Sequence, residues 1–203
     1  MESDTELPLF PLDLVLLPHR RIPLHIFEER YKLMINESME NQTEFGMVWG
    51  TDDDFHDTGC AARVVHLINR FSDGRMNIVI EGTRRFRVVK RQEIHSYISA
   101  IIQEIDDDDE PYNLDLGDRL KALYEEALKL SLGWPAMKPS AMELGHLSYI
   151  VSANLSMPLN EQQALLENTS VNARLSTVAN ALEKALVSLR EIKRRTGGNG
   201  HLA

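Results

Sequence analysis

The stretch that decides the fold runs from Leu7 to Met39 and reads LPLFPLDLVLLPHRRIPLHIFEERYKLMINESM. Its first part holds two short apolar runs, Leu7–Phe10 and Leu14–Leu17, among four prolines: Pro8, Pro11, Pro18 and Pro23. Because proline cannot donate to a strand ladder, such runs are typical of strands at an edge or a bulge. The second part has the spacing of a helix face, with Phe27, Tyr31, Met34, Ile35, Ser38 and Met39. We therefore expect a pair of short strands followed by an amphipathic helix.

Beyond this helix, the sequence up to Ile105 predicts further short strands. Apolar and β-branched residues gather at 43–49, 61–69, 75–80, 83–89 and 97–105. Ser72-Asp73-Gly74 predicts a hairpin, and Glu81-Gly82 predicts a second turn. Trp49, at the end of a strand, is expected in the core. Six or seven strands with one inserted helix indicate a small closed or partly closed β-barrel, since closure removes exposed edges.

The acidic run 105–111 (IDDDDEP) separates this β-rich part from a helical part. Its carboxylates repel one another, so we expect a solvated connection rather than a calcium site, which would need alternating ligands and a glycine turn. Apolar residues then recur at helical spacing in four segments, whose predicted starts include Ser140 with Glu143, Asn160 with Gln163, and Ser170. We predict an α+β chain with a β-barrel at 5–108, a helical bundle at 112–196 and a flexible tail at 197–203.

Composition and charge narrow the class of protein. The 203 residues, 43% hydrophobic and 26% charged, are typical of one or two globular domains. No apolar run approaches the roughly 20 residues that span a bilayer, and the acidic start MESDTELP is unlike a signal peptide, so we expect a cytoplasmic protein without a membrane partner. The single cysteine, Cys60, excludes an internal disulfide and a four-cysteine metal site. The net charge of −9 disfavours a nucleic-acid partner.

Several segments resemble the Lon-protease N-terminal domain family, whose members have a PUA-like β-barrel followed by helices. They are PLFPL, VLLP and IPLHIFEERY in the opening stretch, RMNIVIEGTRRFRVV at Arg75–Val89 and SVNARLSTVANALEKAL at Ser170–Leu186. The resemblance implies a domain that gathers protein substrates for ATPase and protease modules. The sequence holds no G-K-[ST] phosphate loop and has no room for the protease module. We therefore expect the collecting domain to stand alone here, with a separate ATPase or protease as a candidate partner.

No group of residues predicts catalysis, a cofactor or a metal ion. The sequence holds neither the metalloprotease pattern H-E-x-x-H nor the nucleophile elbow G-x-S-x-G. His56 and Cys60 are four residues apart, but the residues between them predict a loop, and His25 is expected to be a core or hinge residue. We therefore expect no enzyme. A hydrolase with catalytic residues far apart in the sequence stays an alternative.

An RNA-binding protein is a second alternative, because PUA-like folds often bind RNA. One run holds five basic residues interleaved with apolar ones: Arg84, Arg85, Arg87, Lys90 and Arg91. Such interleaving is typical of the outward face of a strand, and few aromatic residues that could stack on bases lie nearby. We therefore favour a solvated strand face. Lys193, Arg194 and Arg195 likewise suit the negative end of a helix dipole, with an acidic partner as the alternative.

The leading prediction is a non-enzymatic module that binds proteins or unfolded peptide segments, with an adaptor role in protein quality control. Extended segments would be captured in a cleft between barrel and bundle, by strand addition and by apolar contact. The predicted binding residues lie at the start of the first helix and in an interhelical loop: Phe27, Glu28, Arg30, Tyr31, Trp134 and Met137. Each has a structural alternative, as a core residue or in an intradomain ion pair.

Overall fold

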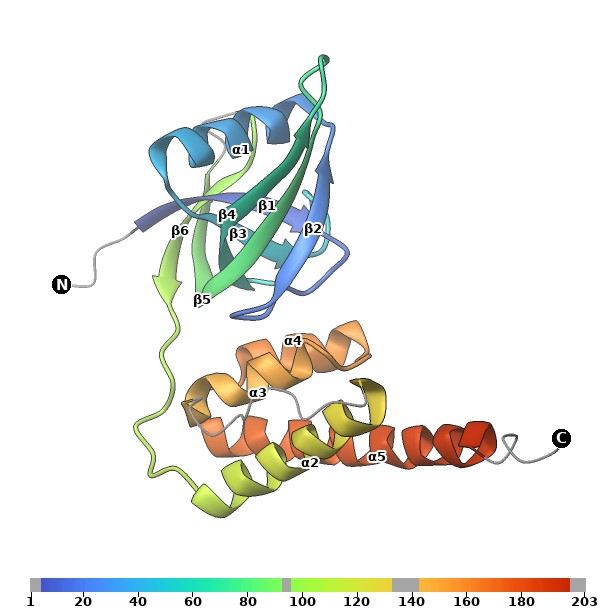
Figure 1. The fold of residues 1–203 in the computed structure, drawn as a ribbon. Helices are drawn as coiled ribbons and strands as arrows, with labels where there is room; N and C mark the ends of the chain where they lie inside the picture. Colours follow the sequence, from blue (N-terminus) through green and yellow to red (C-terminus); the bar gives the residue numbers. More distant parts are fainter. Residues whose placement is uncertain (1–4, 93–95, 133–142, 198–203) are drawn as a thin grey trace, which may run out of the picture. The chain divides into compact units, whose positions relative to one another are not determined.

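The computed structural model describes residues 5–92, 96–132 and 143–197, and these form two compact units. The barrel unit comprises the chain up to Asp106 together with Met157–Thr169, and the helical unit comprises Asp107–Ser156 and the chain from Ser170 onward. Six strands and five helices in the described residues make the predicted α+β fold (Figure 1). The predicted bundle at 112–196 includes residues 157–169, which belong to the barrel unit instead.

The strands of the barrel unit close on one another. Their bounds are β1 Thr5–Leu12, β2 Arg21–Ile26, β3 Phe45–Trp49, β4 Thr58–Arg70, β5 Met76–Gln92 and β6 Ser99–Glu104. β1 pairs with β3 in parallel and with β6 antiparallel, and the antiparallel pairs β3–β4, β4–β5 and β5–β6 complete the circle. β2 lies outside this circle and pairs only with β5 among the described strands. The result is a five-stranded barrel with a three-stranded extension.

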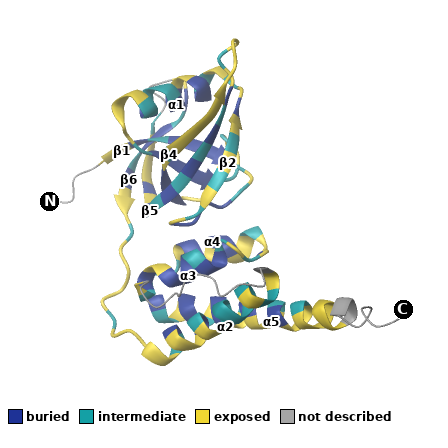
Figure 2. Ribbon diagram, viewed as in Figure 1, coloured by how far each residue is buried: buried dark blue, intermediate teal, exposed yellow. Residues whose placement is uncertain are grey.

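The strand pair β4–β5 therefore has two halves in different surroundings. In the closed half, Thr58–Ala62 of β4 and residues 85–92 of β5 belong to the barrel, and all five β4 residues are buried. In the open half, Arg63–Arg70 of β4 and Met76–Glu81 of β5 extend from the barrel with β2. Seven of these eight β4 residues are exposed, as Figure 2 shows along the far part of the strand.

The predicted turn at Glu81-Gly82 is wrong, because β5 runs unbroken through these residues. Gly82 instead lets another segment approach closely: a Cβ there would lie 2.3 Å from the carbonyl oxygen of Leu17. The Gly82 N–H donates to Arg20 O (3.0 Å), and its carbonyl accepts from His19 N (2.8 Å). The hairpin at Ser72-Asp73-Gly74 is confirmed, with Gly74 at φ +83°.

The opening stretch differs from its prediction at the second strand. Leu14–Leu17 is irregular, although Val15, Leu16 and Leu17 are buried. The second strand is β2, which contains Pro23, and a terminal strand of a sheet tolerates this proline because one of its edges needs no ladder bonds. The helix is confirmed as α1, Glu29–Asn41, which lies across the sheet (Figure 1) and buries Tyr31, Met34 and Ile35.

The helices after the barrel are α2 Leu114–Leu132, α3 Leu144–Ser152, α4 Leu159–Glu167 and α5 Val171–Gly197. The predicted cap at Ser170 is confirmed, because its Oγ accepts from Ala173 N at 3.1 Å. The predicted start at Ser140 lies outside the described residues. α4 begins after Pro158 rather than at Asn160, and the Gln163 amide donates to Thr58 O (3.1 Å) of the barrel. None of the described helices is long and apolar enough to cross a membrane.

The acidic run is more than a solvated connection. Both oxygens of Asp107 accept from Arg174 (2.7 and 2.8 Å), whose side chain is fully buried in the helical unit. Glu110 accepts hydrogen bonds from Ser170 Oγ (2.8 Å) and Asn172 N (3.0 Å) at the start of α5. These bonds lower the pKa of the Glu110 carboxyl, and the bond from the Asn172 backbone has the largest effect. A buried guanidinium needs a carboxylate, so part of the run folds with the helices.

Candidate functional site

Three of the predicted binding residues form a network at the start of α1. Arg30 donates to Glu28 (2.9 and 3.1 Å) and pairs closely with Asp52. Tyr31 is buried, stacks on Phe10 with ring centroids 4.0 Å apart, and donates to Asp52 (3.0 Å). Burial, followed by the bond to Asp52, raises the pKa of the Tyr31 hydroxyl. The network joins α1 to the loop after β3, and a binding role for Glu28, Arg30 and Tyr31 stays a prediction.

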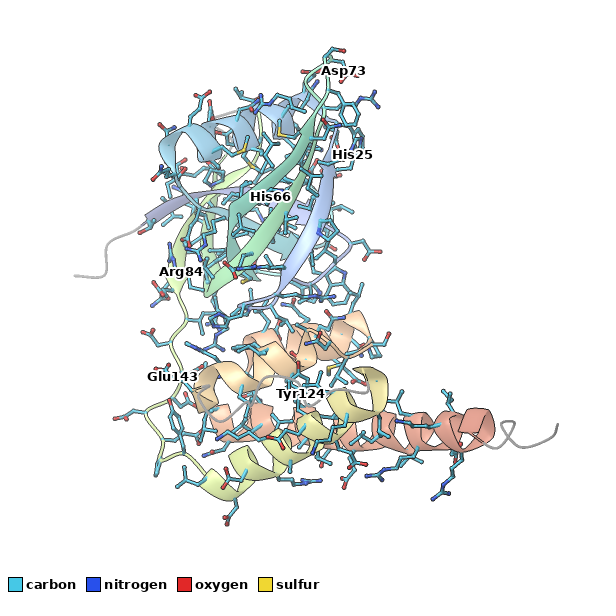
Figure 3. All side chains as sticks on the ribbon, viewed as in Figure 1. His25, His66, Asp73, Arg84, Tyr124 and Glu143 are labelled. Carbon is cyan, nitrogen blue, oxygen red and sulfur yellow. The ribbon has the colours of Figure 1, made fainter. Side chains whose placement is uncertain are left out.

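Phe27, which precedes the helix, is 59% exposed and lies in an aromatic cluster with His25 and Phe71. The His25 ring centroid is 6.0 Å from that of Phe27 and 6.2 Å from that of Phe71. His25 is not a core residue, because it is exposed on β2 (Figure 3) with its Nδ1 2.6 Å from Asn77 Oδ1, and its alternative role as a hinge residue stays a prediction. The cluster draws its members from β2, the α1 start and the β4–β5 hairpin.

More apolar side chains continue from this cluster along β4. Val65, Leu67 and Ile68 are all exposed, Ile68 by 53%. We call Phe27, Phe71, Val65, Leu67 and Ile68 the apolar surface of the open half. Beside it, a groove of about 450 Å³ runs between the end of α1 and β4, lined by residues that include Met39, Gln42, Thr43, Val65 and Leu67. Exposed apolar side chains gathered in this way are typical of an interaction surface.

The arginine-rich run is largely occupied by contacts within the barrel unit. Arg84 pairs with Glu44 (3.0 Å) and Glu104 (3.2 Å). Arg91 lies over the Phe55 ring at 3.8 Å. Arg85 is only 4% exposed and donates to the carbonyls of Leu166 (3.2 Å) and Asn168 (2.8 Å). It thereby caps the C-terminal end of α4. The predicted solvated face therefore does not describe Arg85.

His56 and Cys60 lie in different surroundings. Cys60 is a buried residue of β4, and burial raises the pKa of its thiol. His56 stacks on Trp49 with ring centroids 4.5 Å apart and lies 3.8 Å from Glu167. Trp49 is only partly buried rather than a core residue, and its Nε1 donates to Asp13 (3.0 Å). In the described parts of the chain, no three His, Cys, Asp or Glu side chains gather as a metal site.

Trp134 and Met137, the two binding residues predicted in the interhelical loop, lie outside the described residues. Conversely, the prediction did not include Phe71, Val65, Leu67 and Ile68. Their sequence, VVHLINRF before the Ser72-Asp73-Gly74 turn, has more apolar residues than one buried face of a strand requires. That excess was the available signal.

Comparison with known proteins agrees with this architecture. Lon protease 2 of Myxococcus xanthus is 28% identical over 194 residues, which cover 88% of this chain and 23% of that protein. The Lon protease of Anaeromyxobacter dehalogenans is 27% identical over 195 residues, with 88% and 23% covered. The chain thus spans less than a quarter of the length of these relatives.

Two solved structures share the fold. A Lon N-terminal domain protein from Xanthomonas campestris has a TM-score of 0.67 at 23% identity, over 86% of this chain and 96% of that one. The N-terminal domain of a Mycobacterium avium complex Lon protease has a TM-score of 0.72 at 16% identity, over 88% and 98%. Residues 6–184 match the family described as the ATP-dependent protease La (LON) substrate-binding domain. The predicted family is therefore confirmed, and this chain belongs to the substrate-binding domain family of Lon rather than to its catalytic module.

Proposed function

We propose that this chain binds extended or unfolded segments of proteins through the apolar surface of its open half. The observation that carries the proposal is the aromatic cluster of His25, Phe27 and Phe71, which continues into exposed Leu67 and Ile68. Unfolded proteins expose the apolar side chains that folded proteins bury, so such a surface distinguishes the two. Membership of a substrate-binding family supports this use of the surface.

The strength of such binding follows from the size of the surface. Covering one large apolar side chain contributes about 1.5–3 kcal/mol, but ordering a flexible segment costs about 2–5 kcal/mol or more. The expected dissociation constant is therefore in the micromolar range, which corresponds to a binding free energy of about −8 kcal/mol. Contacts of this strength release their segment quickly, which suits a domain that passes substrates to another module.

In this proposal the domain itself performs no catalysis. An ATPase and a protease, on the same or on a separate polypeptide, would unfold and cleave what it collects. Among the predicted binding residues, Phe27 makes direct contact with the substrate, while Glu28, Arg30 and Tyr31 fix the start of α1 beside it. The roles of Trp134 and Met137 and the cytoplasmic location stay predictions.

The test is a titration of a fluorescently labelled, permanently unfolded protein, followed by anisotropy, with the native form of the same protein as comparison. We expect the unfolded form to bind and the native form not to bind. Replacing Phe27 and Phe71 by serine weakens binding at least about tenfold, because two apolar contacts are lost. The control is Val187→Ser, which removes an apolar side chain from α5 whose exposure, 51%, lies between those of Phe71 (37%) and Phe27 (59%). Equal binding by the double variant and the wild type would contradict the proposal.

A further inference from the structure

β4 has one edge that changes from paired to unpaired along its length. On that edge, Cys60–Ala62 pair with Phe45–Met47 of β3. Towards its N-terminus from Phe45, the chain leaves the sheet for α1 through Gln42, which has φ +55°. No strand among residues 5–92, 96–132 and 143–197 pairs with the same edge from Arg63 to Arg70. We call this strand position, about 26 Å long at 3.3 Å per residue, vacant because no strand of the described residues occupies it. Part of α1 lies beside it, since Arg70 donates to Asn36 (2.8 Å) and Met39 lines a groove with Val65 and Leu67.

The chemistry of a vacant strand position specifies its occupant. An open edge presents backbone N–H and C=O groups at strand spacing, and a second extended backbone complements them. Arg63–Arg70 contains neither proline nor lysine, two residues that protect sheet edges from added strands. The opposite edge of the extension differs, because β2 carries Pro23. The open half thus has one edge that can accept a strand more readily than the other.

Two irregularities in β4 limit how long the added strand can be. The register with β5 shifts between Val64 and His66 and again between Leu67 and Asn69. Val65 and Ile68 therefore have no partner residue opposite them in β5, and each forms a β-bulge. Such bulges increase the local twist of a strand. A short segment can follow this twist, whereas a long regular strand cannot. The vacant edge therefore favours one segment of about four to six residues, shorter than the eight residues of the edge itself.

The side chains around this edge add a preference for apolar and neutral or acidic segments. The groove beside α1, with Met39 and Leu67 in its walls, can receive apolar side chains from a strand placed there. Arg63 and Arg70 stand at the two ends of the edge with no acidic residue between them. Arg63 already pairs with Glu81 (2.9 Å), but Arg70 donates to the neutral amide of Asn36 (2.8 Å). A basic segment would meet like charge here.

We propose that a short, extended, apolar segment of a protein substrate adds to β4 as an extra strand along Arg63–Arg70, in line with β3. This inference rests on the proposed function and specifies it: recognition includes the backbone of the substrate as well as its side chains. It explains why one surface could accept many sequences, since every residue except proline offers the same backbone groups.

The test uses three peptides of one apolar sequence with glutamate at both ends. The first is unmodified, and the other two carry backbone N-methyl groups on alternate residues, on the even positions in one and the odd positions in the other. Each pattern removes the N–H donors from one edge of the strand and leaves the side chains unchanged. We expect one isomer to bind like the unmodified peptide and the other at least about tenfold more weakly, as loss of two or more hydrogen bonds implies.

The outcomes separate this inference from the proposed function. If both isomers bind equally, strongly or weakly, strand addition is overturned, while binding of the unmodified peptide still supports capture. If the unmodified peptide fails to bind and the labelled unfolded protein also fails, the proposed function itself is overturned. A dimer of this chain that joins through the β4 edge and that the peptide cannot displace would assign the edge to a second copy.

A matched pair of protein variants gives the second readout. Val65→Lys places a charge on the vacant edge, and we expect it to weaken binding of the unmodified peptide about tenfold. Val89→Lys is the control. Val89 is also exposed and also lies at a register shift, but this shift is between β5 and β6, away from the vacant edge of β4. Equal effects of the two substitutions on binding would overturn the proposal.

Discussion

The closed and open halves of the β4–β5 strand pair differ in what lies on the other edge of β4. In the closed half, β4 has a neighbour on each side, and Phe86 packs so tightly that a Cβ on Gly46 or Gly59 would lie 2.6 Å from its ring. In the open half, β4 has β5 on one side only, and its apolar side chains remain exposed. Stability thus resides in one half and the proposed binding surface in the other.

This separation has a practical consequence for testing function. Substitutions of exposed residues away from special backbone features usually change the free energy of unfolding by less than about 0.5 kcal/mol. Variants of the apolar surface of the open half should therefore remain folded, so that a loss of binding reports on contact. The hairpin itself is held to α1, because Lys32 donates to the Asp73 carbonyl at 3.1 Å.

The largest expected effect comes from removing the central side chain of the closed half. Phe86→Ala should lower the free energy of unfolding by about 3–5 kcal/mol, because it leaves a cavity among fully buried neighbours. Ile68→Ala in the open half should cost less than about 1 kcal/mol. Urea unfolding of both variants measures the difference. Similar losses in the two would show that the halves do not differ in packing.

A smaller loss of stability is expected from removing the hydrogen bonds between the closed half and α4. Arg85→Met removes the donor to the Leu166 and Asn168 carbonyls and should lower the free energy of unfolding by about 1–3 kcal/mol. Arg87→Met, two residues along β5 and exposed, is the control and should have little effect. Chemical denaturation followed by circular dichroism compares them. A loss in the control as large as that in Arg85→Met would mean that the hydrogen bonds to α4 are not the cause.

The smallest effect concerns pH and lies at the other end of α1. Burial, followed by the hydrogen bond to Glu37 (2.6 Å), raises the pKa of Tyr97 to about 12. The unfolded value is about 10, so the stabilisation is complete below about pH 10 and is lost as pH rises towards about 12. The stability advantage of the wild type over Tyr97→Phe should therefore shrink between about pH 10 and about pH 12, measured by urea midpoints. A constant difference would contradict the assignment.

The sequence predicted the elements well where local signals agree. Helix α1, the Ser72-Asp73-Gly74 hairpin and the Ser170 cap follow from periodicity, turn residues and a capping side chain. The errors have tertiary causes. Gly82 resembles a turn residue but serves the approach of the Leu17 backbone, and Asp107 resembles a linker residue but pairs with Arg174, 67 positions away. Only the fold reveals such partners.

The candidate site shows the same limit. Phe27 could be singled out from the opening stretch, but its cluster with His25 and Phe71 requires the pairing of β2 with β5. The vacant edge of β4 cannot be predicted from residues 63–70 alone, because it depends on where α1 ends and β3 begins. A binding surface made by absent pairing has no sequence pattern of its own.

Amide hydrogen exchange with a bound unfolded protein tests the central claim most directly. The account predicts slower exchange in Arg63–Arg70 of β4 and around Phe27 and Phe71, with Cys60–Ala62 unchanged because β3 already pairs with this edge of β4 there. Slower exchange confined to α2, α3 and α5, with none in the open half, would contradict it.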